Sequence, residues 1–135
     1  MCLEGASRAG AEFLAAMPNA DLCAYYVWVP MLSSDNEPAA RASAQRFDER
    51  RAIHYWDADR RLSRRMAKAL AINTRRSAVT GDEPAFAWDI YLAYAKGSSD
   101  VAAPDFWMHQ LAVDHAPRLD ASEWRRRIDG LLAQA

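Results

Sequence analysis

The thiols and imidazoles of this chain are the side chains with the greatest potential for chemistry, and the sequence contains two cysteines and three histidines. Cys2 stands at the start of an Ala-rich segment, where a helix N-terminus would stabilise a thiolate through its free N–H groups and its dipole. Gly5 occupies the position at which a two-cysteine redox motif places its second thiol. The residue types leave two interpretations of Cys2 open, a reactive thiol or an ordinary residue near a chain terminus.

The other cysteine and the histidines have simpler interpretations. Cys23 lies within the apolar residues 22–29, and we expect it to be a small buried hydrophobe. His54 and His109 each lie in an aromatic-rich segment, and no HxxxH, CxxC or HExxH spacing is present. We therefore expect structural histidines that are hydrogen-bonded at strand ends, and we predict no metal site. His109 is also a candidate base near Cys2.

Two charged features interrupt the apolar pattern. Asp89 stands in an otherwise apolar segment, and a buried carboxylate there requires a cationic or backbone partner. We expect a paired, structural Asp89, because a buried and unpaired one would have a raised pKa and be a site candidate. The second feature is a run of basic residues within 60–68, with Arg75 and Arg76 beyond it. We interpret it as a solvated helix face, with phosphate or an acidic partner as the alternative.

The composition narrows the class of protein. The 135 residues, of which 51% are hydrophobic and 26% charged, fit one globular domain over residues 1–135. A formal net charge of −1 disfavours nucleic acid and anionic membranes as partners. No apolar run approaches the roughly 20 residues of a membrane span, and no secretory signal pattern is present. We expect a cytoplasmic protein with reduced thiols, and the lack of GxGxxG, Walker and GxSxG motifs predicts no cofactor.

Hydrophobic periodicity predicts alternating helices and strands. Helices are expected over residues 5–17, 33–47, 57–70 and 120–134, and strands over residues 22–29, 52–56, 85–95 and 106–111. The continuously apolar first strand is predicted to be buried on both faces. Asp57 or Asp59 is expected to cap the third helix, and Asp120 the fourth. The resulting order, α-β-α-β-α-β-β-α, predicts an α/β protein with a mixed sheet, helices on both faces and a final hairpin.

Three stretches resemble thioredoxin-like proteins of the redoxin type, in particular a group of bacterial members. They are "VWVPML" at 27–32, "HYWDADRRLSRRMAKAL" at 54–70, and "AWDIYLAY" at 87–94 together with "FWMHQL" at 106–111. The element order also resembles the thioredoxin fold, β-α-β-α-β-α-β-β-α, apart from its first strand. The resemblance covers nearly the whole chain and implies a thioredoxin-like mixed sheet flanked by helices.

The resemblance also implies roles for individual residues. The CxxC motif of the family maps onto Cys2 and Gly5, so Cys2 takes the nucleophilic position and the resolving cysteine is replaced. A two-cysteine cycle needs both sulfurs, which leaves a monothiol reaction with a small thiol or a thiol-containing protein. Pro84, ahead of the strand over 85–95, is the candidate for the family's cis-proline. The family's first strand has no counterpart before Cys2, so we expect an N-terminally truncated sequence or a reorganised sheet.

Two function hypotheses of equal weight follow, and they leave open whether the chain is an enzyme. The first is a monothiol redox role with Cys2 as the nucleophile. The second is a non-catalytic thioredoxin-fold module that binds a partner protein or a small ligand through its aromatic surface. Heavy-metal handling by Cys2 and Cys23 is a weaker third. The aromatic residues in question are Tyr25, Tyr26, Trp28, Tyr55, Trp56, Trp88, Tyr91, Tyr94 and Trp107.

Overall fold

A computed structural model describes residues 13–47, 49–72, 84–110 and 115–134. In chain order the elements are β1 (Ala24–Trp28), α2 (Glu37–Ala44), the 3-10 turn η2 (Gln45–Phe47), β2 (Ala52–Trp56), α3 (Arg61–Ala69), β3 (Ile90–Ala93), β4 (Phe106–His109) and α4 (Ala121–Leu132). This succession confirms the predicted α/β character. The first predicted helix, over 5–17, lies mostly outside the described residues.

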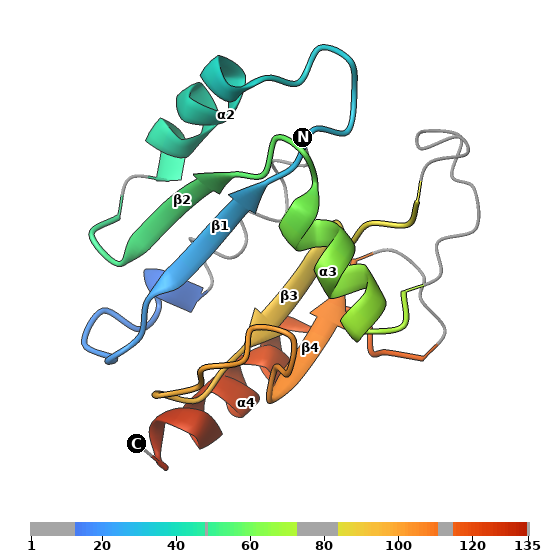
Figure 1. Cartoon of the computed structure of the whole chain (residues 1–135). Helices are drawn as coiled ribbons and strands as arrows, with labels where there is room; N and C mark the ends of the chain where they lie inside the picture. Colours follow the sequence, from blue (N-terminus) through green and yellow to red (C-terminus); the bar gives the residue numbers. More distant parts are fainter. Residues whose placement is uncertain (1–12, 48, 73–83, 111–114, 135) are drawn as a thin grey trace.

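The strands form two small sheets, where the sequence predicts a single mixed one. β1 pairs with β2 in parallel, in a register that runs from Ala24↔Ala52 to Trp28↔Trp56. β3 pairs with β4 in antiparallel fashion and forms the predicted hairpin. No ladder joins β1 to β3 within the described ranges, although Figure 1 shows the strands in the order β2, β1, β3, β4. The expectation of one continuous sheet is therefore corrected to two sheets placed edge to edge.

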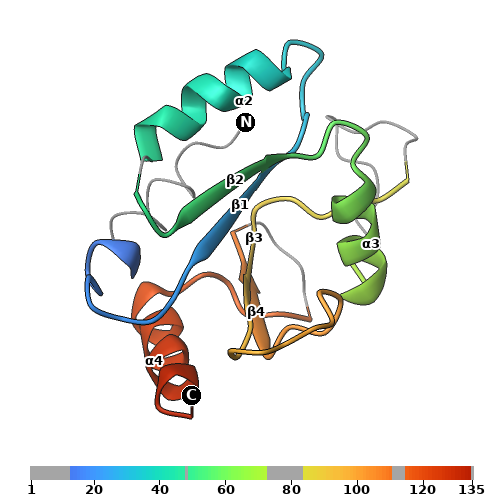
Figure 2. The ribbon, with the colours of Figure 1, turned by 60° about the vertical axis from the view of Figure 1, so that its left-hand side comes forward.

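Helices lie on both sides of these sheets. Figure 2 shows α2 and α4 on one side of the strands and α3 on the other. Asn36 begins α2 by accepting a hydrogen bond from the amide of Ala39, and Asp120 begins α4 by accepting one from Glu123. Both starts match the capping residues in the sequence. Helices flanking the strands on both sides agree with the layered arrangement that the alternating pattern predicts.

The start of α3 differs from the prediction of a simple aspartate cap. The residue at the N-cap position is Arg60, in a left-handed conformation with φ of 56°. Asp57, three residues earlier, still satisfies the free amides of the helix, because its carboxylate accepts hydrogen bonds from the N–H groups of Arg61 and Ser63 at 2.8 and 2.9 Å. Asp57 therefore supplies the capping function from outside the helix.

The third predicted strand is shorter than expected. Residues 85–95 read as one apolar strand, but β3 begins only at Ile90. The cause is Asp89, whose φ of 50° is a left-handed conformation that a strand cannot contain and that aspartate tolerates better than most residues. Its carbonyl accepts a hydrogen bond from the amide of Gln110 at 3.0 Å. Asp89 is half-buried and placed at a bend, in agreement with a structural role.

Two hydrophobic clusters form on opposite faces of the β3–β4 sheet. One lies beneath α3, against which the side chains of Ile90, Leu92 and Trp107 pack. The other lies beneath α4 and consists of buried Phe13, Met17, Ala93, Met108 and Trp124. Alternate residues of β3 thus enter different clusters, as the two-residue repeat of a strand requires.

Candidate functional site

The structure describes only part of the predicted thiol site. Cys2 and Gly5 lie outside the described residues. Pro84 is described and exposed, but its preceding peptide bond involves residue 83, which is not described. The predicted nucleophile and the predicted cis-proline therefore stay predictions.

His109, the candidate base, is held at the end of β4. Its side chain is 1% exposed, and Nε2 lies 2.9 Å from the carbonyl oxygen of Ala116. Since a carbonyl only accepts, Nε2 donates its proton to this oxygen. The backbone of His109 is fixed as well, by hydrogen bonds to Pro117 and Leu119. This is the geometry expected of a structural histidine, and its suggested action on Cys2 stays a prediction.

Cys23 is exposed, and the expectation that it is buried is wrong. The reason is that β1 begins at Ala24, so Cys23 precedes the strand, and none of the described helices covers the face of β1 on which the exposed Tyr25 lies. A hydrogen bond between the Cys23 thiol and the Tyr25 phenol raises the pKa of Tyr25 above its usual value. The thiol therefore belongs to the rim of an aromatic surface.

That surface is the face of the β1–β2 sheet turned to the same side as α3. Tyr25, Ile53 and Tyr55 are 60%, 39% and 54% exposed, and together they are called the open face from here on. The register places Tyr25 beside Ile53 and Val27 beside Tyr55, so these side chains share one face. The rings of Tyr25 and Tyr55 stack with centroids 6.2 Å apart. The predicted burial of the first strand on both faces is therefore wrong, because α3 covers only the neighbouring sheet.

The opposite face of β1–β2 is packed with aromatic rings. Tyr26 stacks on His54 with centroids 4.8 Å apart, and Phe47 of η2 lies 6.0 Å from Tyr26 and 6.1 Å from Trp28. The indole N–H of Trp28 donates to Nδ1 of His54 at 3.2 Å, so His54 carries its proton on Nε2. This cluster fixes β1 and β2 against η2 and leaves the open face as the uncovered side.

Two buried polar atoms in this cluster lack a hydrogen-bond partner, namely the hydroxyl of Tyr26 and Nε2 of His54. Burial, and then the nearby charge of Glu49, raise the pKa of Tyr26. A shallow hollow of about 320 Å³ lies alongside, lined by Ala44, Gln45, Glu49, Ala52 and His54. The hollow is small and partly acidic, and it is separate from the open face because it lies on the other side of the sheet.

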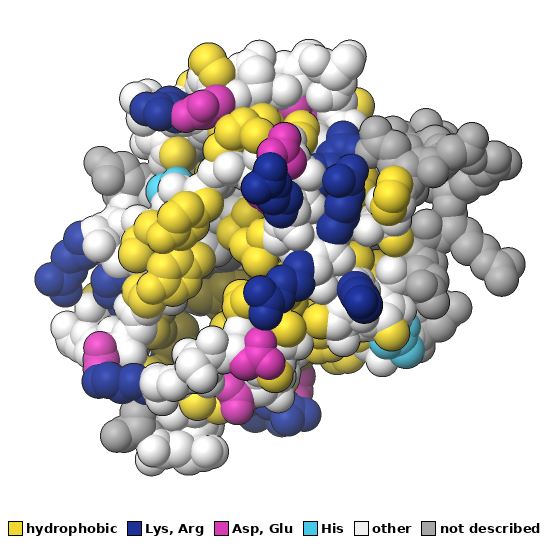
Figure 3. All heavy atoms as spheres, in the orientation of Figure 1, with side chains coloured by type: hydrophobic (Ala, Val, Ile, Leu, Met, Phe, Trp, Pro, Cys, Tyr) yellow, Lys and Arg dark blue, Asp and Glu magenta, His cyan; other side chains and the backbone are white. Residues whose placement is uncertain are grey.

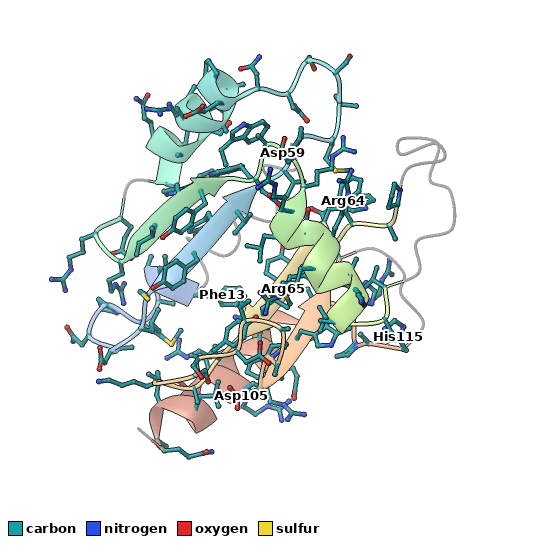
Figure 4. The ribbon with its side chains drawn as sticks, viewed as in Figure 1. Phe13, Asp59, Arg64, Arg65, Asp105 and His115 are labelled. Carbon is teal, nitrogen blue, oxygen red and sulfur yellow. The ribbon has the colours of Figure 1, made fainter. Side chains whose placement is uncertain are left out.

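The basic residues of α3 border the open face in Figure 3, and Figure 4 shows Arg64 and Arg65 on that helix. Arg65 approaches Asp100 at 3.7 Å, and Arg61 approaches Asp59 at 3.2 Å, with the four side chains more than 60% exposed. Such exposed pairs are weak and exchange readily with other anions. This agrees with a solvated basic face.

Arg60 is excluded from that basic face. Its Nε donates to the carbonyl of Pro30 at 2.9 Å, and its guanidinium lies 4.4 Å from the centre of the buried Phe86 ring. Arg60 therefore ties the segment after β1 to the start of α3 through a hydrogen bond, and its cation–π contact joins the same point to Phe86, ahead of β3.

Comparisons with known proteins supply no relative for this site: no family model, curated protein or solved structure matches the chain. Within the described residues, no cluster of three or more histidine, cysteine or carboxylate side chains could hold a metal ion. The helices of the described part are too short and too polar to cross a bilayer. The candidate site therefore depends on geometry alone.

Sequence reasoning named the aromatic residues but did not say which of them face outward. No sequence signal marks the open side of β2, because its exposed residues, Ile53 and Tyr55, are as apolar as the half-buried residues with which they alternate. The continuous apolar run of β1 concealed the same alternation, because Tyr25 and Tyr26 are both aromatic and yet point to opposite faces.

Proposed function

We propose that this chain is a thioredoxin-like module that binds another polypeptide through the open face. The observation that carries the proposal is the grouping of Tyr25, Ile53 and Tyr55, all more than a third exposed, side by side on two paired strands. Isolated exposed hydrophobic residues are common, but a contiguous patch of this kind marks an interaction surface. Tyrosine is also enriched in such surfaces, because it presents a large area at little entropic cost.

The surroundings of the open face support a polypeptide partner with apolar and acidic character. The face is the broad side of a sheet, and the hollow lined by His54 lies on the opposite side. Basic side chains of α3 lie beside it in Figure 3, and Arg64 and Arg65, which Figure 4 shows on that helix, are exposed. A partner that covers the tyrosines would bring its rim against these guanidinium groups, where carboxylates are favoured.

Site-specific photo-crosslinking in the cells that produce the protein tests this proposal. A photoreactive amino acid replaces Tyr55 in one variant and Leu32 in a matched control, because the two residues are 54% and 56% exposed. We expect a discrete crosslinked polypeptide from position 55, none from position 32, and loss of the position-55 product when Tyr25→Lys is added. Equal products from both positions, or no product from position 55, would contradict the proposal.

The monothiol role of Cys2 is the second candidate, supported by its sequence position at the head of the Ala-rich segment. In that reaction the Cys2 thiolate attacks a disulfide, forms a mixed disulfide and releases one thiolate; a small thiol then releases Cys2. The rate of alkylation against pH in a Cys23→Ser variant tests it. We expect half-maximal reactivity well below the usual thiol value of about 8.5. An unshifted Cys2, reacting like Cys23 in the reciprocal Cys2→Ser variant, would remove this candidate.

A further inference from the structure

The two sheets present strand edges to each other without pairing. β1 and β3 are neighbours in Figure 1, yet among the described residues β1 forms a ladder only with β2, and β3 only with β4. The two sheets also approach each other far less closely than do the strands within either one. Figure 3 shows the surface hollowed between the open face and α3, with hydrophobic atoms in the hollow.

The backbone of β1 directs hydrogen-bonding groups toward β3. The amide of Ala24 donates to Arg51, and the carbonyl of Trp28 accepts from Asp57, so residues 24, 26 and 28 bond toward β2. Alternation along a strand then turns the N–H and C=O groups of Tyr25 and Val27 to the opposite edge.

The backbone of β3 behaves in the same way. The carbonyl of Asp89 accepts from the amide of Gln110, which makes 89/110, 91/108 and 93/106 the hydrogen-bonded pairs of the hairpin. The N–H and C=O groups of Ile90 and Leu92 therefore turn away from β4. The hydrogen bonds of His109, which pairs with Ile90, agree with this alternation. Its backbone N–H and C=O groups bond to Pro117 and Leu119, on the side of β4 away from β3.

We propose that one extended strand of a partner polypeptide enters between β1 and β3 and joins the two sheets into a single five-stranded sheet with the partner strand at its centre. Its backbone would pair with Tyr25 and Val27 on one side and with Ile90 and Leu92 on the other. Strand addition at an open edge is an established mode of peptide recognition. The inference rests on the proposed function, because it names the element of the partner that binds beside the open face.

The flanking side chains define the chemistry of this strand. Ile90 and Leu92 pack toward the cluster under α3, whereas Tyr91 and Ala93 pack toward the cluster under α4. A strand next to β3 would have apolar surroundings on both faces, so it must be uncharged and apolar at consecutive positions. A two-stranded sheet is marginal by itself, and the added ladder would therefore also stabilise the chain.

Amide hydrogen exchange measured by NMR tests the proposal directly. In the chain alone, we expect fast exchange at the edge amides of Tyr25, Val27, Ile90 and Leu92, and slow exchange at Tyr26 and Trp28. A peptide of five valines flanked by glutamates, at up to about 1 mM, should slow the edge amides by at least about tenfold. Unchanged edge exchange at this concentration would overturn the proposal.

Two further outcomes would also overturn it. Edge amides that are already protected in the chain alone would show that its own residues occupy the position, and protection that rises with protein concentration would show pairing between copies. Val27→Pro removes one edge amide at a position where proline is tolerated, and it should abolish the effect of the peptide, while Val27→Thr retains it.

The same measurement separates this proposal from the proposed function. If crosslinking at position 55 depends on Tyr25 while the edge amides never become protected, the partner binds the open face by side chains alone. In that case the strand proposal fails and the proposed function stands.

Discussion

The two sheets of this molecule differ in how completely they are covered. The β3–β4 sheet has α3 on one face and α4 on the other, with a hydrophobic cluster beneath each helix. The β1–β2 sheet is packed against η2 on one face and carries Tyr25 and Tyr55 uncovered on the other. The strands are of similar length and composition, so covering elements, not the strands, create the difference.

This contrast separates stability from function within one small chain. Burial of apolar area on both faces stabilises the β3–β4 sheet, since each fully buried large side chain contributes about 1.5–3 kcal/mol. The open face contributes far less, because its side chains remain largely in water. A surface that is costly to leave exposed and adds little to stability is therefore the part we assign to binding.

The largest expected effect tests the covered sheet. Trp124 is 6% exposed, and its ring lies 4.8 Å from Phe106 and 5.8 Å from Phe13. Trp124→Ala should lower the free energy of unfolding by about 3–5 kcal/mol, because it removes a large ring from a closed cluster. Urea unfolding followed by far-UV circular dichroism measures this change.

The matched change on the open face is Tyr55→Ala, for which we expect a loss below about 1 kcal/mol, the value of a cross-strand pair. A loss at Tyr55 comparable with that at Trp124 would show that the open face is part of the core. The two sheets would then not differ in how completely they are covered.

The next prediction tests whether the β1–β2 sheet and the β3–β4 sheet, with the elements that cover them, unfold together. Arg51 precedes β2, and its guanidinium donates to the carbonyls of Leu14 and Met17, both at 2.7 Å. Arg51→Met removes the guanidinium hydrogen bonds to both carbonyls and to the carboxylate of Glu49, leaving these acceptors only their backbone donors, so unfolding should cost about 2–3 kcal/mol less. The control is Arg41→Met, whose side chain is 78% exposed in a helical pair with Glu37.

For Arg41→Met we expect a loss below about 0.5 kcal/mol. If Arg51→Met instead produces two separate unfolding transitions by circular dichroism and tryptophan fluorescence, the sheets are independent units. Such a result would show that each sheet unfolds as its own cooperative unit.

A smaller effect concerns the link from β2 to α3. Asp57 accepts hydrogen bonds from three α3 amides and from the hydroxyl of Ser63 at 3.1 Å. Asp57→Ala should cost about 1–2 kcal/mol, as for the loss of a helix cap. Asp59→Ala, which removes only an exposed pair with Arg61, is the control and should cost less than about 0.5 kcal/mol in the same urea titration. Equal losses would mean that Asp57 does not cap the helix.

The sequence predicted the elements better than their assembly. Local signals sufficed where they act over a few residues, and so β2 matches its predicted bounds and the predicted cap at Asp120 is confirmed. The bend at Asp89 was not foreseen, because only its backbone conformation, and not its residue type, ends the strand.

The division into two sheets and the exposure of Cys23 could not be predicted from the sequence, for a different reason. Both depend on which long-range neighbour covers a strand, and an apolar run in one strand does not encode its neighbour. Of the candidate site, the aromatic residues were identified, but the open face needed the register of β1 against β2.

The smallest expected effect concerns an exposed ion pair that joins the β1–β2 sheet to the β3–β4 sheet. Asp21 precedes β1 and Lys96 follows β3, and the carboxylate and ammonium groups lie 2.6 Å apart. The hydrogen bond and then the charge of Lys96 lower the pKa of Asp21, and the same contacts raise the pKa of Lys96. The pair is thus fully formed above the usual aspartate value of about 4 and is lost as the pH falls through the lowered pKa. It is lost again as the pH rises through the raised pKa of Lys96.

Lys96→Met should raise the pKa of Asp21 toward its usual value, which a titration of the Asp21 carboxyl by carbon NMR would detect. The shift should shrink in concentrated salt, because the two side chains are 81% and 69% exposed and therefore well screened. Lys68→Met, at an exposed position on α3, should leave the Asp21 titration unchanged. If Asp21 titrates alike in all three proteins, this contact does not join the two sheets in solution, and the strand edges of β1 and β3 would be freer to separate around an added strand.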